Sequence, residues 1–556
     1  MKKFSAKEKV INGTISTVSS SADLLANEKL PPTDNNDHEN ESSTKPEQQE
    51  HLETSPPREL ASLDIKSPWR SLWLANLILF VTAIQYSVFF SSLFPFLEEI
   101  DSTANASFFG VIIAASSLCQ LISSPIYGLW SNKIKQSRIP VGCGMIFIIC
   151  GNCMFLFVEA FPVRRKWALL IARMIAGMGT GNLSVLRAYI ATASATKDRS
   201  RAISYGTASF TLGMIIGPGL QALFVPIGYP GYVSGIFHLD MYTAPAFMSI
   251  TFQVLLMILL ISTFEEKYAG IMSENQKEDP FFVLPKFNMS SALLLIFTWF
   301  TILFCGVTLE VISSPYSMAM WDWTKAEAVK YNGLILTVSA SISFSFYLLY
   351  GFYLSGRMNE RISIVIGISM VLIFYIVTYP WPGLPGKLKY QDVGLQNDSI
   401  SLLTTDTPMS SLKNSTVALL SEPVGCLPSY KWCEWTPPVS LHLYLAIWVF
   451  QSVGFPMVSV NVSTLFAKVL GPRRQGTMQG MLQAAGSFAR FIGPLLMSYF
   501  FQYYGPRVAW GFCAAVILSC ILPWAIFFRS VRPLDPQPQL KPGEYFKYNQ
   551  GRLYRF

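Results

Sequence analysis

The sequence predicts an all-α polytopic membrane protein. Of its 556 residues, 51% are hydrophobic and only 14% are charged, whereas about a quarter of the residues in a soluble protein are charged. Long apolar segments recur along the chain, and each is near the roughly 20 residues that a helix needs to cross a bilayer. The sequence lacks the short alternating segments typical of transmembrane strands, so we expect every span to be a helix.

Twelve apolar segments are long enough to be spans, and the polar connector EEKYAGIMSENQKEDPFFVLPKFN divides them into two sets of six. The predicted spans cover residues 72–94, 108–130, 139–159, 167–191, 202–225, 242–262, 291–313, 332–354, 362–380, 440–468, 475–501 and 508–529. We expect a tail over 1–70, an N-terminal bundle over 71–263, a linker over 264–290, a C-terminal bundle over 291–530 and a second tail over 531–556.

The first 70 residues differ from the rest in composition. They are rich in Ser, Thr, Asn, Glu and Pro and show no apolar period, which predicts a disordered tail. A signal peptide would need a cationic segment, a short apolar stretch and a cleavage site before Ser71, and these are not found. We therefore expect the first span to act as its own insertion signal.

The positions of Lys and Arg predict that both termini are cytosolic. Basic residues gather in the loops after the even-numbered spans, whereas the loops after the first and fifth spans have none, and cytosolic loops are the ones enriched in Lys and Arg. The basic residues in question are Lys133, Lys135, Arg138, Lys197, Arg199, Arg201, Arg357, Arg361, Lys468, Arg473 and Arg474. The basic residues near Arg164 and Lys330 lie in loops predicted on the non-cytosolic side and are local exceptions to this pattern. The net charge of +8 thus reflects topology, and we expect no nucleic-acid partner.

The loop over 381–439 is expected on the non-cytosolic side. It contains the sequons at Asn397 and Asn414, and the two loop cysteines Cys426 and Cys433. N-glycosylation and disulfide formation both belong to that compartment. We therefore expect a glycosylated lumenal loop with a Cys426–Cys433 disulfide.

A motif recurs at matching places in the two halves. The second span is followed by GLWSNKIKQSR and the eighth by GFYLSGRMNER, with Gly128 spaced to Asn132 as Gly351 is to Ser355. The fifth and eleventh spans each contain a Gly-Pro pair, and these pairs are Gly217-Pro218 and Gly493-Pro494. Two matches in register indicate an internal repeat.

These motifs resemble the signature loops of the major facilitator superfamily, in which a glycine is followed by an acid and then by basic residues such as Lys133. The fourth span, with Arg173 and three glycines in RMIAGMGTGNL, is similar to the superfamily's pattern as well. The resemblance implies twelve helices in two pseudo-symmetric six-helix bundles that rock around a central cavity. Asn132 departs from the usual Asp, so we expect a neutral hydrogen bond in place of a charged latch.

Longer blocks, including LEVISSPYSMAMWDWTKAEAVKYNGLIL and LGPRRQGTMQGMLQAAGSFARFIGPLL, resemble a lysosomal branch of that superfamily. This resemblance implies an endosomal or lysosomal membrane protein that conducts chloride and supports lysosomal ion balance. A strict acidic dileucine sorting signal is not found in the N-terminal tail, where SSADLLANEKL is the nearest match. The location therefore depends on the resemblance.

Four ionisable residues within spans are candidates for transport, because a charge in a bilayer is costly unless it is paired or hydrated. Glu310 in the seventh span is a candidate proton-coupling acid, and its alternative is a fixed ion pair. Arg490 and Arg187 could attract an anion, because a guanidinium keeps its charge and offers several donors. Arg173 is a fourth candidate, although it could instead snorkel to the interface.

Polar and aromatic residues within the spans have more ordinary interpretations. Gln120, Asn182 and Asn461 could line the cavity, but buried amides more often join helices. Trp321 and Trp323 fit an interfacial aromatic belt.

The sequence does not predict an enzyme. It has no phosphate-binding GxxxxGK[ST] loop, and its four histidines show no metal-ligand spacing, so we expect no cofactor and no metal. The partners we expect are the lipid bilayer and either a small anion, chloride above all, or a small solute moved with protons. Three hypotheses follow: anion conduction, proton-coupled solute transport, and a membrane scaffold without transport.

Overall fold

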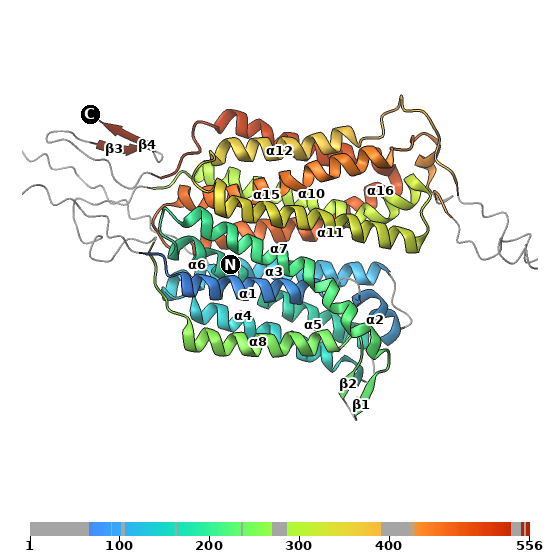
Figure 1. Cartoon of the computed structure of the whole chain (residues 1–556), viewed down its shortest axis with the longest axis horizontal. Helices are drawn as coiled ribbons and strands as arrows, with labels where there is room; N and C mark the ends of the chain where they lie inside the picture. The colour runs from blue at the N-terminus through green and yellow to red at the C-terminus, as the bar shows by residue number, and fades with distance from the viewer. Residues whose placement is uncertain are drawn as a thin grey trace, which may run out of the picture. The chain divides into compact units, whose positions relative to one another are not determined.

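The computed structural model describes residues 66–89, 92–101, 106–161, 164–234, 237–269, 286–390, 424–426, 430–534, 546–549 and 552–555. Helices dominate this part of the chain (Figure 1). The predicted tail over 1–70 lies almost wholly outside the described residues, as does most of the predicted linker over 264–290.

The first half of the chain forms helices α1 to α8, drawn from blue to green in Figure 1. Their bounds are α1 (Trp69–Ser87), α2 (Leu93–Ile100), α3 (Ala106–Ile134), α4 (Arg138–Leu156), α5 (Arg165–Thr180), α6 (Leu183–Ala193), α7 (Arg199–Phe224) and α8 (Ala244–Thr263). Two short 3₁₀ turns are η1 (Val158–Ala160) and η2 (Val225–Ile227), and a small antiparallel hairpin joins β1 (Tyr232–Ser234) to β2 (Phe237–Leu239).

The second half forms α10 to α16, drawn from yellow-green to red. Its elements are α10 (Met289–Trp321), α11 (Lys325–Leu349), the π-helical turn η3 (Tyr350–Leu354), α12 (Glu360–Val377), the 3₁₀ turn η4 (Lys431–Glu434), α15 (Leu441–Leu470) and α16 (Gly476–Phe527). A second antiparallel hairpin, β3 (Phe546–Asn549) with β4 (Arg552–Arg555), lies near the C-terminus.

Ten helical segments in the described residues are long and apolar enough to cross a membrane. One of them, α16, has 52 residues and is interrupted at Gly505, whose φ is 81°, so it can supply two crossings. Helix α1 is not among the ten, and we assign it as the first crossing. Its polar residues Asn76 and Gln85 are buried. With α1 included and α16 counted as two crossings, the described residues offer twelve candidate crossings, while ten helices meet the length and composition of a span.

Several helices begin where a side chain accepts hydrogen bonds from the first free backbone N–H groups. Asn288 accepts from Ser290 N and Ser291 N at the start of α10. Thr324 and Glu327 form a reciprocal capping box at the start of α11, which explains why this helix begins before the predicted span 332–354.

Two predicted spans are divided in the structure. The first, 72–94, ends as α1 at Ser87, and the short helix α2 follows with Pro95 in its first turn, where a proline is tolerated. The fourth, 167–191, is split into α5 and α6 at Gly181 and Asn182. The length of an apolar segment predicts a membrane span, but it does not predict where the helix within that span is interrupted.

Each half has its own apolar core. The largest cluster lies wholly in the second half and includes Phe304, Tyr316, Trp510 and Trp524. Two clusters lie in the first half, apart from Ala467, which α15 contributes to one of them. A small fourth cluster joins the halves through Ala208 on α7, and Tyr347, Tyr350 and Val460 from the second half.

The halves meet mainly where α3 packs along α16 and where α7 packs against α11 and η3. Close contacts gather at one end of the bundle, formed by the loops at 135–137, 194–198, 355–359 and 471–475. We call this the basic end. There, Ser204 Oγ donates to the carbonyl of Tyr347 at 2.6 Å, and the rings of Tyr205 and Phe352 lie 5.6 Å apart.

Candidate functional site

Four polar side chains from four helices approach one another between the two halves. Arg490 on α16 places its guanidinium 5.6 Å from the ring of Tyr86 on α1. The Glu310 carboxyl on α10 lies near enough to interact electrostatically with Arg490, and Tyr86 lies within reach of both. Arg187 on α6 interacts electrostatically with Arg490 and with Tyr347 on α11. We call Arg187, Arg490 and Glu310, with Tyr86 beside them, the central charge group.

Glu310, for which a fixed ion pair was the alternative interpretation, has no ion-pair partner within the part of the chain that the structure describes. Among the described residues, no Lys or Arg nitrogen lies within 4.0 Å of its carboxylate, whereas Glu360 and Asp101 have such partners. Glu310 is exposed although it lies within a membrane-spanning helix. A carboxylate that is near Arg490 but accessible suits a group that exchanges protons or partners.

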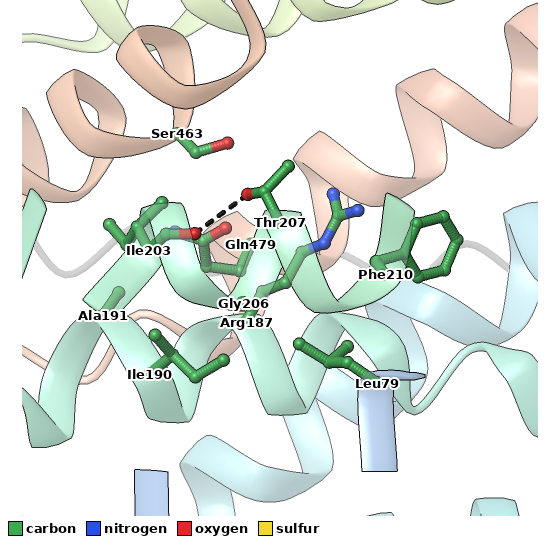
Figure 2. Close-up of a pocket in the computed structure, with 10 residues that line it drawn as sticks. All are labelled: Leu79, Arg187, Ile190, Ala191, Ile203, Gly206, Thr207, Phe210, Ser463 and Gln479. Carbon is green, nitrogen blue, oxygen red and sulfur yellow. Dashed lines mark hydrogen bonds between the residues drawn. The ribbon is translucent and has the colours of Figure 1, made fainter. Parts of the chain in front are cut away.

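Arg187 lines a small pocket between the halves, with a volume of about 30 Å³. Figure 2 shows its side chain reaching from α6 toward Thr207 and Phe210 on α7. Ser463 from α15 and Gln479 from α16 complete the wall from the other half. The rest of the lining is largely apolar, and comes from Leu79, Ile190, Ala191, Ile203 and Gly206.

Aromatic rings flank the Arg187 guanidinium. Its central carbon lies 5.3 Å from the Trp299 ring on α10 and 6.0 Å from the Phe210 ring on α7. Rings at this distance attract a cation and leave the guanidinium N–H groups available to a ligand. Trp299 belongs to the second half of the chain and Phe210 to the first, so the surroundings of Arg187 depend on how the halves are placed.

The charge balance of the central charge group favours an anion. Two guanidinium groups face one carboxylate, so the group carries one excess positive charge when Glu310 is ionised and two when it is protonated. In a protein interior this excess acts with little screening. The arrangement can therefore bind an anion, and it can bind the anion more tightly when Glu310 holds a proton.

Arg173 is not part of this group and does not snorkel. It is only 8% exposed, and its guanidinium carbon lies 3.7 Å from the Phe89 ring centre and 4.5 Å from that of Phe155. Its Nε and Nη2 atoms have no hydrogen-bond partner among the described residues. The side chain is held inside the first half by two rings, because these supply the electron-rich faces that a buried cation needs.

The predicted motif after the second span joins the two halves at the basic end. Asn132 Oδ1 accepts from Gly476 N at 2.9 Å, and Asn132 Nδ2 donates to Thr477 Oγ1 at 2.8 Å. A Cβ on Gly128 would overlap the backbone of Gly476, so glycine permits this close approach. Lys133 lies exposed in the last turn of α3. Asn132 thus makes the neutral contact expected from its amide.

The corresponding motif after the eighth span packs differently. A Cβ on Gly351 would press on the Tyr205 ring of α7, so this glycine also permits an approach between halves. The two Gly-Pro pairs are unequal as well. Gly217, followed by Pro218 in α7, packs closely on Ser87 of α1, whereas the nearest atom to a Cβ on Gly493, followed by Pro494 in α16, would be Phe304 Cδ2 at 3.7 Å.

The buried amides join helices. Asn182 Nδ2 donates to the Val141 carbonyl at 3.3 Å, and Asn461 accepts from the Tyr350 hydroxyl at 2.9 Å. Gln120 is 5% exposed. Trp321 donates to the carbonyl of Val439 at 2.8 Å, and its ring is tilted against Trp323 and meets Tyr444 edge-on. None of these side chains lines the pocket of Figure 2.

The structure joins Cys426 and Cys433 in a disulfide. The sequons at Asn397 and Asn414 lie outside the described residues, so their glycosylation stays a prediction. No group of three or more potential metal ligands occurs in the part of the chain that the structure describes.

Two polar features were not predicted from the sequence. Tyr86 occurs in the apolar first span, and only its position beside Arg490 singles it out. Glu159 after α4 contacts His238 of β2 through its carboxylate and is buried. Nearby, Asp240 holds the turn before α8 by accepting from Tyr242 N and Thr243 N at 2.7 and 2.9 Å. Both features depend on contacts between distant segments, which a single sequence does not display.

Comparisons with known proteins agree with this architecture. The family model of the Major Facilitator Superfamily matches residues 52–390 and 417–551. A curated relative, major facilitator superfamily domain-containing protein 8 of Xenopus laevis, is 33% identical over 488 residues, which cover 84% of this chain and 92% of the relative. Another, major facilitator superfamily domain-containing protein 10 of Mus musculus, is 23% identical and covers 77% and 80%.

Solved structures share the fold at low sequence identity. The human organic anion transporter MFSD10 superposes with a TM-score of 0.56 at 14% identity, covering 82% of this chain and 99% of that one. The proton:xylose symporter XylE superposes with a TM-score of 0.57 at 12% identity, covering 84% and 97%. At these identities the likeness concerns the fold alone.

Proposed function

Because the chain belongs to the major facilitator superfamily, we propose that it is a transport protein that moves a small anion, chloride in the first instance, across an endosomal or lysosomal membrane. The observation that carries this proposal is the central charge group, where Arg187 and Arg490 outnumber Glu310. The lysosomal location and the choice of chloride follow from the resemblance of longer sequence blocks to a lysosomal branch of the family.

The proposed site lies between the halves, where alternating access would expose it to each side in turn. Helices α6 and α7 from the first half, and α15 and α16 from the second, contribute to the wall of the Arg187 pocket. An anion held by Arg187 and Arg490 would neutralise their mutual repulsion and so favour their approach. Binding would thereby be coupled to the relative position of the halves.

Glu310 supplies a proton dependence to the same site. When ionised, it competes with the anion for Arg490; when protonated, it leaves both guanidinium groups to the anion. Anion affinity in the proposed site therefore rises as pH falls. This coupling needs Glu310 to be accessible, as it is, and to lack a fixed ion pair.

A second candidate function is proton-coupled transport of a small organic solute, with Glu310 as the coupling acid. The apolar lining beside Arg187 supports an organic anion as much as an inorganic one, since Phe210, Leu79 and Ile190 could contact a hydrocarbon body. The human MFSD10 structure carries the description organic anion transporter. The two candidates share the arginines and differ in the ligand.

The proposal is tested by patch-clamp recording from enlarged endolysosomes that carry the protein, with chloride replaced by a large impermeant anion and the lumenal pH varied. We expect a current whose reversal potential follows the chloride gradient and which is lost in Arg490→Gln. Arg357→Gln removes an exposed cation outside the site and is the matched control. A current that is absent, or unchanged in Arg490→Gln, would refute chloride conduction at this site. Uptake of an organic anion would then be measured, and its absence would leave the scaffold hypothesis.

A further inference from the structure

A groove with apolar walls and a basic end lies on the surface of the second half. An open groove of about 590 Å³ runs where α12 and α16 meet. Its lining is formed by Val365, Ile521, Trp524, Ala525, Ile526, Phe528 and Arg529. This groove is separate from the pocket of Figure 2, since the two share no residue.

The groove and the surface of α12 and α16 beside it are apolar and exposed. Ile526 is 76% exposed and Leu522, one turn earlier on α16, is 64% exposed. Ile362 and Ile366 on α12 are also exposed. In a helix that crosses a membrane, apolar side chains exposed in this way contact acyl chains. Trp524 lies at the base, because its ring is buried and its Nε1 donates to Thr298 Oγ1 at 2.9 Å.

One end of the groove is basic. Arg529 lines it, and Arg361 lies beside it, with its guanidinium 5.4 Å from the Phe528 ring and Nη1 donating to the Phe528 carbonyl at 3.5 Å. Neither arginine has an ion pair with a described residue, and the neighbouring carboxylate, Glu360, is already paired with Lys468. Two cations therefore lie at this end of the groove without an ion-pair partner among the described residues.

Hydrogen bonds fix the position of the backbone beside Arg529. Asn288 Nδ2 donates to Ser530 Oγ at 3.0 Å, and Ser291 Oγ donates to the Ser530 carbonyl at 3.3 Å. These bonds tie the residue after Arg529 to the start of α10. The backbone that carries Arg529 is therefore held in place at the end of the groove.

We propose that this groove binds one anionic glycerophospholipid, with its phosphate at Arg361 and Arg529 and an acyl chain against Ala525 and Ile526. Basic residues at a membrane edge are common, and on their own they indicate only topology. Here they end an apolar groove of a size that an acyl chain can enter, and their charge matches an anionic headgroup. The site does not depend on which ion the protein transports.

The test is native mass spectrometry of the purified full chain, titrated with dioleoyl phosphatidylserine against dioleoyl phosphatidylcholine. We expect one phosphatidylserine to be retained in preference. An interfacial arginine contributes roughly fivefold to such binding, so Arg361→Ala with Arg529→Ala should weaken it about 25-fold. The matched control, Lys66→Ala with Lys197→Ala, removes two exposed cations of the first half and should leave it unchanged.

Two further measurements separate the headgroup from the acyl chain. Ala525→Trp fills the groove while keeping both arginines, and should displace the lipid. Glycerol phosphate, which offers the charge without the chain, should not compete at concentrations that saturate the lipid. Equal retention of the two lipids, or equal loss in the double variant and its control, would overturn the proposal.

Discussion

Asn132 joins the halves at the basic end, and its replacement should shift the balance between access states. Asn132→Ala removes the bond from Gly476 N at 2.9 Å and the bond to Thr477 Oγ1 at 2.8 Å. Each bond contributes on the order of 1 kcal/mol net, so the state closed at this end should lose about 2 kcal/mol. That loss corresponds to a shift of about 30-fold in the equilibrium between states.

Asn132→Asp should act in the opposite direction. The carboxylate keeps the acceptor for Gly476 N and can accept from the Thr477 hydroxyl, and it places a negative charge at the N-terminus of α16. Such a charge is favourable by roughly 0.3–1 kcal/mol, so the closed state should gain a few-fold in population. The two variants thereby separate the loss of a bond from the addition of a charge.

The assay is the distance distribution between spin labels on genetically encoded residues at Lys197 and Arg357, which lie exposed at the basic end on opposite halves. Asn132→Ala should move population to longer distances. Ser131→Ala is the control, because its hydroxyl donates to the Gln136 carbonyl within one half. An unchanged distribution in Asn132→Ala would refute the idea that this contact selects the state.

Three other predictions concern charge and topology. Glu310→Gln should abolish the pH dependence of anion flux in proteoliposomes while leaving passive chloride current largely intact, because the central charge group then keeps its two excess charges at every pH. Burial raises the pKa of Asp240, so the folded state binds its proton more tightly; this stabilisation is present below about pH 4 and is lost as pH rises through the folded pKa. Asp240→Asn should therefore flatten the fall in Tm over that range, measured by differential scanning fluorimetry, and an unchanged slope would contradict the assignment. Asn397→Gln and Asn414→Gln should each increase gel mobility, and no shift for either would refute the lumenal placement of that loop.

The fold class was predictable because the length of each apolar segment can be read directly from consecutive residues of the sequence. The predicted span 139–159 corresponds to α4 and 242–262 to α8. The internal repeat identified Gly128 and Gly351, and both permit close approaches between the halves. The repeat overstated the likeness of Gly217 and Gly493, because the packing of each depends on the residue opposite, which is Ser87 in one case and Phe304 in the other.

The candidate site was predictable only in part. Charges within spans are rare and costly, so Glu310, Arg187 and Arg490 stood out from their composition alone. The same reasoning included Arg173, which lies apart from them between Phe89 and Phe155. Tyr86 was missed because a tyrosine in an apolar helix is ordinary. Tertiary packing decides which helices face one another, and a single sequence does not predict that packing.

Anion flux into proteoliposomes, driven by an imposed chloride gradient with the membrane potential clamped, tests the role of the central charge group most directly. Wild type, Arg187→Gln, Arg490→Gln and the control Arg357→Gln would be compared at matched protein content. We predict gradient-dependent flux in the wild type and control, and at least a tenfold loss in each site variant, as expected when an interaction of about 1.4 kcal/mol or more is removed. Equal flux in all four proteins, or none in the wild type, would contradict the account.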